Sequence, residues 1–319
     1  MKIIKPSSVI MEHNVHPYEF IEKVGRTCYK SEDLITKGSA VKFVKNLVSR
    51  SHWAMLEHET IYVVTTQRFM SEFLSDIIYR SENLAFFNYS TNTAVAILSG
   101  SFRAFHDLFE KDYTEYSFKY LEYVVGSEFP EVFGATECVK SRSDHPECII
   151  YSRQSFIDTF KHRPDILFKH LTHTIKFVCD RGVSHEFVRH RVASFAQEST
   201  RYCNYTKNKF GNELTVIEPC FYTDESRAEE YKIWKQCCEI IEKGYLKLSR
   251  LGSIPQESRS ILENSLKTEL IITATETEWQ HIVNLRYLGT TGEPHPQIKE
   301  SMSLCINDLI RESDGRIKL

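Results

Sequence analysis

The chain has no run of roughly eighteen consecutive apolar residues, so we expect no membrane-spanning helix. The segment from Met1 to Pro6 is too short and too soon broken by proline to be a signal peptide. No Cys-x-x-Cys pair occurs, and the nine cysteines are scattered apart from the adjacent Cys237 and Cys238. An odd number of scattered cysteines favours free thiols in a reducing cytoplasm over a disulfide framework.

A strong charge of one sign is also absent. The chain has 40 lysines and arginines against 43 aspartates and glutamates, and its formal net charge is −3. Without a wide basic stripe, a nucleic-acid binder is disfavoured. The composition, with 41% hydrophobic and 26% charged residues, is typical of a globular protein. A chain of 319 residues can bury a large core, and we predict a single domain over residues 1–319.

Apolar periodicity predicts a mixture of strands and helices. A first strand is expected over residues 3–11, with amphipathic helices over 17–29 and 39–48. The further predictions are strands at 60–64, 91–98 and 170–179, helices over 102–109 and 112–125, a loop over 136–147, a helix from 182 that ends near 193–194, an extended turn over 197–201, a strand near 214–217, helices over 226–250 and 255–270, a short strand or buried turn over 270–274, and helices over 276–288 and 296–310.

The most informative stretch runs from Arg189 to Tyr202. It holds three arginines, one histidine, two serines, a glutamine and a glutamate within fourteen residues. From Arg181 to Lys209 there are six lysines and arginines against two glutamates. Arginine's planar fork suits phosphate oxygens, and serine hydroxyls add neutral donors. Such a patch on a weakly acidic chain indicates a bound anion. On composition alone, a solvated helix end with a charged loop is an equally good interpretation.

The pattern Arg-His-Arg-x-x-Ser-x-x-x-x-Ser-x-Arg resembles the signature of the flavin-dependent thymidylate synthases. The chain fits that signature without a gap, at Arg189, His190, Arg191, Ser194, Ser199 and Arg201. The resemblance implies an α+β fold, with a mixed or antiparallel central sheet flanked by long helices, in a homotetramer whose subunits share active sites. It also implies the reductive methylation of 2′-deoxyuridine 5′-monophosphate (dUMP) to thymidylate, with FAD as hydride carrier and methylenetetrahydrofolate and NADPH as cosubstrates.

The same resemblance assigns roles to individual residues. It places Arg286 against the uracil carbonyl, where a fixed cation would stabilise negative charge as hydride adds to the ring. The residues assigned to dUMP are Glu186, Gln197, Glu198, Ser199, Thr200, Arg201, Arg259 and Arg286, and those assigned to FAD are His52, Arg189, His190, Arg191 and His281.

The chain departs from the family pattern in several places. Glu186 stands where glutamine is common, Ser51 where glycine is usual, and the segment after Arg286 is longer. Residues 59–170 are predicted to be an insertion without an assigned role. Residues 60–74 match residues 174–188 at five positions of fifteen, which is near chance for apolar strands. Because residues 75–77 are Ser-Asp-Ile where the later segment has Arg-His-Arg, only the later segment is expected to hold an anion.

Other interpretations remain open. A flavin-free thymidylate synthase would use a cysteine nucleophile, and Pro219-Cys220 resembles its Pro-Cys pair, although Phe221 follows where histidine is usual. A different flavin- or nucleotide-binding oxidoreductase, or a non-catalytic nucleotide or nucleic-acid binder, could share the arginine cluster. Metal binding is not predicted, because the histidine pairs His170/His173 and His185/His190 lack further ligands at familiar spacing.

Overall fold

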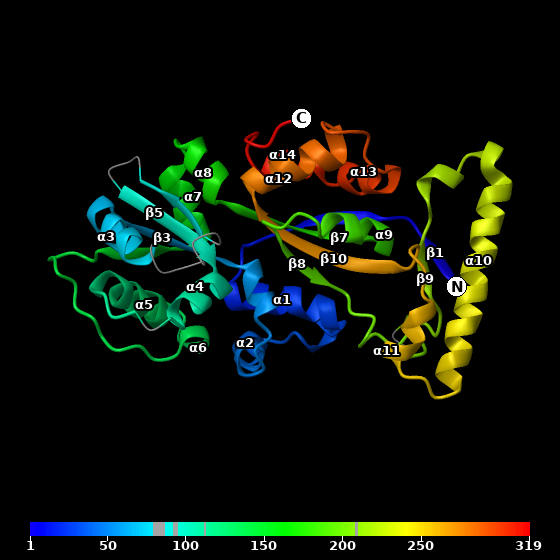
Figure 1. Ribbon diagram of the computed structural model, residues 1–319, viewed down its shortest axis with the longest axis horizontal. Coiled ribbons are helices and arrows are strands. Elements are labelled where there is room, and N and C mark those ends of the chain that lie inside the picture. The colour runs from blue at the N-terminus through cyan, green and yellow to red at the C-terminus, as the bar shows by residue number, and fades with distance from the viewer. Residues whose placement is uncertain (79–86, 92–94, 112, 208–209) are drawn as a thin grey trace.

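The computed structural model describes residues 1–78, 87–91, 95–111, 113–207 and 210–319. Two four-stranded antiparallel sheets lie one after the other along the long axis, each covered by helices (Figure 1). The predicted α+β class with antiparallel pairing is therefore confirmed. The prediction had one central sheet, whereas the described strands form two four-stranded sheets.

The central sheet has the strand order β2-β7-β10-β8. All three of its strand pairings are antiparallel. The predicted strand over 3–11 is divided, and its first part pairs in parallel with β9 in a separate two-stranded sheet. Pro6 lies between the two parts and has no N–H for a ladder, which explains the division. The strands are β1 (Lys2–Ile4), β2 (Ser7–Met11), β7 (Thr172–Asp180), β8 (Ser194–Gln197), β9 (Thr215–Ile217) and β10 (Lys267–Thr275).

The predicted helix over 255–270 is wrong. Helix α11 is only Pro255–Ser258, a 3-10 turn follows at Arg259–Ile261, and β10 begins at Lys267. Strand β10 is rich in β-branched residues and is buried on both faces between β7 and β8. Such a run suits a central strand, because branched side chains pack well on a pleated surface. The expected short strand at 270–274 is thus the middle of a nine-residue strand.

Helices cover both faces of the central sheet. The helices predicted at 17–29, 39–48 and 226–250 are confirmed, while the one predicted over 296–310 is two helices separated at Leu304 and Cys305. Trp279, Phe177 and Met302 are fully buried in the core between this sheet and the C-terminal helices. The helices are α1 (Pro17–Tyr29), α2 (Ser39–Ser49), α9 (Arg181–Phe187), α10 (Ala228–Arg250), α12 (Glu276–Val283), which continues as a π-helical turn (Asn284–Leu288), α13 (Pro296–Ser303) and α14 (Ile306–Glu312), with short 3-10 turns at Glu32–Leu34, Trp53–His58, Cys220–Tyr222 and Glu225–Arg227.

The second sheet is built entirely from residues 60–151 and has the order β4-β5-β3-β6. Its core is continuous with the core under α1 and α2. The helix predicted over 102–109 is confirmed, the helix predicted from 112 begins at Tyr116, and residues 92–94 and 112 lie outside the described residues. The elements are β3 (Thr60–Thr66), α3 (Gln67–Ile78), β4 (Phe87–Ser90), β5 (Val95–Ser101), α4 (Phe102–Phe109), α5 (Tyr116–Glu128), α6 (Pro130–Phe133), β6 (Cys148–Tyr151), α7 (Arg153–Phe160) and α8 (Pro164–His170).

Three further predictions concern the cysteines, membrane-spanning helices and the segment 136–147. All nine cysteines lie in the described ranges and are free thiols, as the sequence predicts. Across those same ranges, no helix has the length and apolar character needed to cross a membrane. The segment 136–147, predicted as a loop, holds neither a helix nor a strand.

Candidate functional site

The arginine-rich stretch leaves α9 earlier than predicted. Helix α9 is capped by the Asp180 carboxylate, which accepts from the backbone N–H of Val183 at 2.8 Å and from Gln297 Nε2 at 2.8 Å. It ends at Phe187, not near 193–194, so the prediction of its end is wrong. The chain turns at His190 and then pairs with the edge of β10 over Ser194–Gln197. Gln197 therefore ends a strand, where an extended turn was predicted, because β10 offers an unpaired edge there.

Arg286 is the centre of a hydrogen-bonded group. It comes from the π-helical turn after α12 and reaches the turn after α9. Its Nη1 donates to Glu186 Oε2 at 3.0 Å, its Nη2 to the Glu186 carbonyl at 3.1 Å, and its Nε to His190 Nε2 at 3.1 Å. The side chain is only 17% exposed and that of Glu186 is 26% exposed. A partly buried guanidinium with these three acceptors is held in one orientation.

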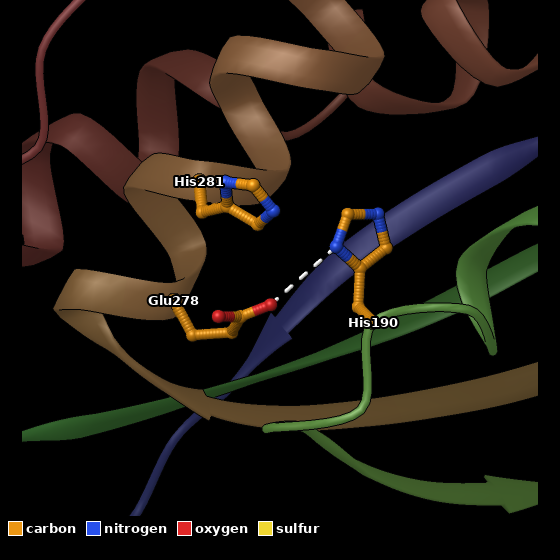
Figure 2. A group of neighbouring side chains, drawn as sticks. All are labelled: His190, Glu278 and His281. Carbon is orange, nitrogen blue, oxygen red and sulfur yellow. Dashed lines mark ion pairs between the residues drawn. The ribbon is translucent and has the colours of Figure 1, made fainter.

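The bond from Arg286 fixes the protonation of His190. An arginine N–H can only donate, so Nε2 of this buried imidazole accepts and carries no proton. Neutral His190 then carries its proton on Nδ1, which faces Glu278 Oε1 at 3.4 Å. Figure 2 shows Glu278 and His281 on one face of α12, with the Glu278 carboxylate directed at His190. His281 contacts the His190 ring edge-on, with ring centroids 5.6 Å apart.

These three side chains could be taken for a metal centre. Donor atoms of His190, Glu278 and His281 all lie within 4.8 Å of one another. A neutral imidazole has one lone pair, however, and Arg286 occupies that of His190. A metal at Nδ1 would have to displace the proton that faces Glu278, beside a fixed guanidinium. The chemistry of the group therefore favours a polar relay over an ion: Arg286 donates to His190, and Nδ1 of His190 faces the Glu278 carboxylate at 3.4 Å.

Gln197 and Glu198 are consecutive in the chain, but their side chains have different hydrogen-bond partners. Gln197 donates to Ser184 Oγ at 2.9 Å and to Thr268 Oγ1 at 3.2 Å, so it lies against α9 and β10. Glu198 is 3% exposed and accepts from Lys267 at 2.8 Å. Burial alone would raise the pKa of the neighbouring Glu269, but the lysines Lys267, Lys30 and Lys176 hold it at about 2. The carboxylate of Glu198 thus belongs to a buried cluster of ion pairs, in which Lys267 bridges Glu198 and Glu269.

The remaining arginines of the stretch are accessible. Arg189, Arg191 and Arg201 are exposed, and none of them forms an ion pair with a carboxylate of the described chain. The Ser199 hydroxyl accepts from the backbone N–H of Arg201 at 3.3 Å, and Thr200 is 8% exposed. These three guanidinium groups suit phosphate oxygens, because no carboxylate of the described chain pairs with them. Arg189 and Arg191 could hold a diphosphate such as that of FAD.

His52 and Arg259 lie apart from this group. His52 is exposed, and its Nδ1 is 3.3 Å from the hydroxyl of Tyr29, whose ring meets Tyr202 edge-on at 6.1 Å between centroids. It also lines a cavity of about 370 Å³ together with Trp53 and Arg103. In the described parts of the chain, no contact joins His52 to His190 or His281. Arg259 is exposed on the 3-10 turn after α11, and no described side chain pairs with it.

The structure thus brings together residues from separate parts of the chain. Arg286, His281, His190 and Glu186 form one group, whereas the resemblance assigned Arg286 and Glu186 to dUMP and His190 and His281 to FAD. Glu278 belongs to the same group but was missed in the sequence. Its position three residues before His281 places it on the same helical face, and that spacing is the signal that could have identified it.

Fold and site together define an α+β protein with a cluster of accessible arginines at the edge of its central sheet. The family model described as "Thymidylate synthase complementing protein" matches residues 121–311, which is more than half of the chain. The chain belongs to this family. The match begins inside the segment 59–170 that was predicted to be an insertion.

Curated relatives carry the name flavin-dependent thymidylate synthase. The protein of Pyrococcus furiosus is 31% identical over 144 residues, which are 43% of this chain and 57% of the relative. Those of Thermococcus onnurineus and Geobacter sulfurreducens are 30% identical over 108 and 106 residues, covering 34% and 33% of this chain and 42% and 43% of the relatives. The chain spans about half the length of the curated relatives it matches.

Among solved structures, the chain is similar to a UMP/dUMP methylase, PolB from Streptomyces cacaoi bound with 5-Br dUMP. The TM-score is 0.43 and the identity 11%, over 100% of both chains.

Proposed function

We propose that the protein is a flavin-dependent thymidylate synthase that methylates dUMP reductively, with methylenetetrahydrofolate as carbon donor and NADPH as reductant. The observation that carries this proposal is the group formed by Arg286, His190 and Glu186, next to the accessible Arg189 and Arg191. It unites the two arginine-bearing parts of the family pattern, which lie 96 positions apart. Membership of the family and the names of its relatives support the same reaction.

The residues present fit FAD. Arg189 and Arg191 offer two guanidinium groups without carboxylate partners in the described chain, and His190 and His281 supply aromatic edges beside them. We assign these four residues, and His52, to the cofactor. FAD would supply the hydride that reduces the transferred carbon. The protein's own contribution is to bind the dinucleotide and hold it beside the pyrimidine.

The nucleotide is assigned to the other end of the stretch. Ser199, Thr200 and Arg201 follow β8 and supply hydroxyl, backbone and guanidinium donors for a phosphate, with Gln197 and Arg259 assisting. Glu198 was assigned there too, but its carboxylate already accepts from Lys267 inside the protein. In the proposed site Glu198 therefore positions the backbone of Ser199 and does not itself bind phosphate.

Arg286 is assigned to the uracil carbonyl. The guanidinium would stabilise negative charge that develops on the ring as hydride adds. In the present arrangement Glu186 Oε2 competes for that cation at 3.0 Å. Nucleotide binding would therefore exchange part of the contact with Glu186 for a contact with the pyrimidine.

A cysteine nucleophile fits the structure poorly. Burial, followed by the nearby Glu300 carboxylate, raises the pKa of Cys220 to about 11. A thiol must lose its proton to attack carbon, so Cys220 is poorly suited to start the flavin-free reaction. Retained activity in Cys220→Ser would agree with this reasoning.

We also propose that the protein is a cytoplasmic homotetramer with shared active sites, and that residues 59–170 are an insertion in a single domain. Exposed apolar side chains on and just after α10 support self-association. Ile233 is 53% exposed, Ile240 66% and Leu251 75%. They lie seven and eleven residues apart, and so on one side of the helix. Light scattering after gel filtration would give the number of subunits.

The decisive experiment is the visible absorption spectrum of the purified protein, before and after dUMP is added. Flavin bands that shift with dUMP would place both ligands in one site. A protein that takes up neither FAD nor dUMP would refute the proposal. Competition with other pyrimidine nucleotides, followed by the same bands, would identify a related enzyme with a different substrate.

A further inference from the structure

The two four-stranded sheets also share the way in which their middle strands pair. In the central sheet, β7 pairs with β10 so that the first residue of one faces the last of the other, Thr172 opposite Thr275. In the second sheet, β3 pairs with β5 in the same way, Thr60 opposite Ser101. The opposite ends are paired end to end as well, with Asp180 opposite Lys267 and Thr66 opposite Val95, and the central pair is longer by two residues, which keeps each side chain on its own face. A shift of one residue would turn every side chain to the other face, so this agreement is a strong constraint.

Each of these four strands ends in a residue that caps the next helix. Thr275 Oγ1 accepts from the backbone N–H of Glu278 at 3.3 Å, and Ser101 Oγ accepts from that of Ala104 at 3.1 Å. On the other strands, the Asp180 carboxylate accepts from the N–H of Val183 at 2.8 Å, and Thr66 Oγ1 from that of Phe69 at 3.1 Å. The acceptor lies three residues before the donor in all four cases, which is the geometry of a helix N-cap.

The helices after these strands bury corresponding positions. In α9 the buried residues are Val183, Ser184 and Phe187, and in α3 the residues at the same distances from the cap, Phe69, Met70 and Phe73, are buried. In α12 and α4 the positions one, four and seven residues after the cap are buried in both helices, namely Glu276, Trp279 and Ile282, and Phe102, Phe105 and Leu108, while Val283 and Ala104 are each buried in one helix only. The weak sequence repeat between residues 60–74 and 174–188 aligns the start of α3 with the start of α9.

The outer strands also correspond. Strand β4 follows α3 and lies beside β5, as β8 follows α9 and lies beside β10. On the other edge, the last residue of β2, Met11, faces the third residue of β7, Thr174. The last residue of β6, Tyr151, faces the third residue of β3, Tyr62. Both sheets therefore have four corresponding strands in the same spatial order, although β2 precedes the other strands of its sheet along the chain and β6 follows those of its own.

Two buried histidines join the sheets reciprocally. His58 lies two residues before β3, and its Nδ1 is 2.8 Å from Thr273 Oγ1 in β10. His170 lies two residues before β7, and its Nδ1 is 2.8 Å from Ser99 Oγ in β5. Thr273 and Ser99 are themselves corresponding residues, each two positions before the cap. Each sheet thus receives a histidine from the segment that leads into the other.

We infer that residues 60–151 form a second copy of the strand-and-helix unit they interrupt, and that this copy has lost the ligand site, so that each chain binds one nucleotide. In the sequence, Ser75, Asp76 and Ile77 stand where the later segment has Arg189, His190 and Arg191, and Ala104 and Asp107 stand where it has Glu278 and His281. Acidic and apolar residues replace the cationic and hydrogen-bonding ones, and an anion would be repelled there. The copy acts as a scaffold that covers α1 and α2.

The copy can be tested without any ligand by double-mutant cycles on unfolding temperature. His58→Gln with Thr273→Val, and His170→Gln with Ser99→Ala, should each be non-additive, because each pair shares one buried hydrogen bond. We expect each single change to lower the Tm by roughly 2–6 °C, through an unsatisfied buried group. Pairs that are not crossed, such as His58 with Ser99, are the matched controls and should be additive. Additive behaviour in either crossed pair would overturn the reciprocal arrangement.

The loss of the second site rests on the proposed function and is tested by titrating FAD-loaded protein with dUMP in a calorimeter. One dUMP per chain is expected, and two per chain would overturn the inference. No binding at all would contradict the proposed function, while the ligand-free cycles would still decide whether the two sheets exchange histidines as described. Asp107→Ala should leave the stoichiometry and affinity unchanged, because Asp107 corresponds to a site residue without being in the site.

Discussion

Arg286 donates from Nε to Nε2 of His190 at 3.1 Å, although the two residues are 96 positions apart in the chain. This bond makes His190 an acceptor and leaves its Nδ1 proton directed at Glu278, 3.4 Å away. The cation assigned to the pyrimidine and the imidazole assigned to the flavin are therefore not independent. We therefore expect a substitution at Glu278 to alter how His190 accepts from Arg286.

Glu278→Ala should weaken the relay. Without the carboxylate, the Nδ1 proton of His190 no longer faces a negative charge, and the tautomer that accepts from Arg286 is less favoured. We expect a loss of up to about 1 kcal/mol in the free energy of unfolding, the order of magnitude of one polar contact. Glu278→Gln keeps an oxygen acceptor and is the matched control. Urea unfolding of both variants measures the effect, and equal stabilities would contradict the assigned tautomer.

Arg201→Ala should separate the two ligand sites. The exposed guanidinium is assigned to the phosphate of dUMP, so its removal should weaken dUMP binding roughly 10- to 100-fold, while FAD stays bound. Arg189→Ala should instead lose FAD first. Titration of each variant, followed by flavin absorption, measures both affinities. An equal loss of both ligands in folded Arg201→Ala would refute this division.

Glu186→Gln tests the competition for Arg286. The substitution removes the ion pair with Nη1 but retains an amide oxygen that can accept from it. If Arg286 must leave Glu186 to reach the pyrimidine, dUMP affinity should rise about two- to fivefold, the range expected for a partly exposed ion pair. Glu186→Asp, which keeps the charge on a shorter side chain, is the control. Weaker binding in Glu186→Gln would mean that the carboxylate itself contacts the nucleotide.

Much of the local structure could be predicted from the sequence. The helices at 17–29 and 102–109 have a clear apolar side and begin at a proline or after a capping serine, so their bounds needed no tertiary information. Strand β10 could not be assigned in this way, because its burial depends on pairing with β7 and β8. The end of α9 was misplaced for the same reason, since the free edge of β10 draws Ser194–Gln197 into the sheet.

The site was predictable as residue types more than as geometry. The resemblance assigned His190, His281 and Arg286 to the site, but nothing in the sequence shows that Arg286 bonds to His190 or that Glu278 lies beside them. Glu198 was assigned to the ligand, yet Lys267 holds its carboxylate inside the protein. The second copy was hidden because its five matches in fifteen residues carry little information, whereas strand register, which records pairing partners, makes it evident.

The buried histidines predict a loss of stability in mild acid. Burial lowers the pKa of both His58 and His170 to about 3, whereas an unfolded histidine titrates near 6.5. Below pH ~6.5 the unfolded chain binds protons that the folded chain does not, so the stabilising contribution is fully present above that pH and is lost as the pH falls. Each histidine should cost about 2 kcal/mol between pH 6.5 and 5, a window above the titration of most carboxylates.

His58→Gln removes one of these titrations. Its free energy of unfolding should therefore fall less steeply than that of the unmodified protein, by roughly 1.4 kcal/mol per pH unit over the same window. His162→Gln is the matched control, because His162 is exposed, and its slope should equal that of the unmodified protein. Urea unfolding at pH 7.5, 6.5, 5.5 and 5 gives the slopes. If His58→Gln and His162→Gln show the same dependence on pH, folding does not lower the pKa of His58, and the imidazole that contacts Thr273 is not kept neutral by burial.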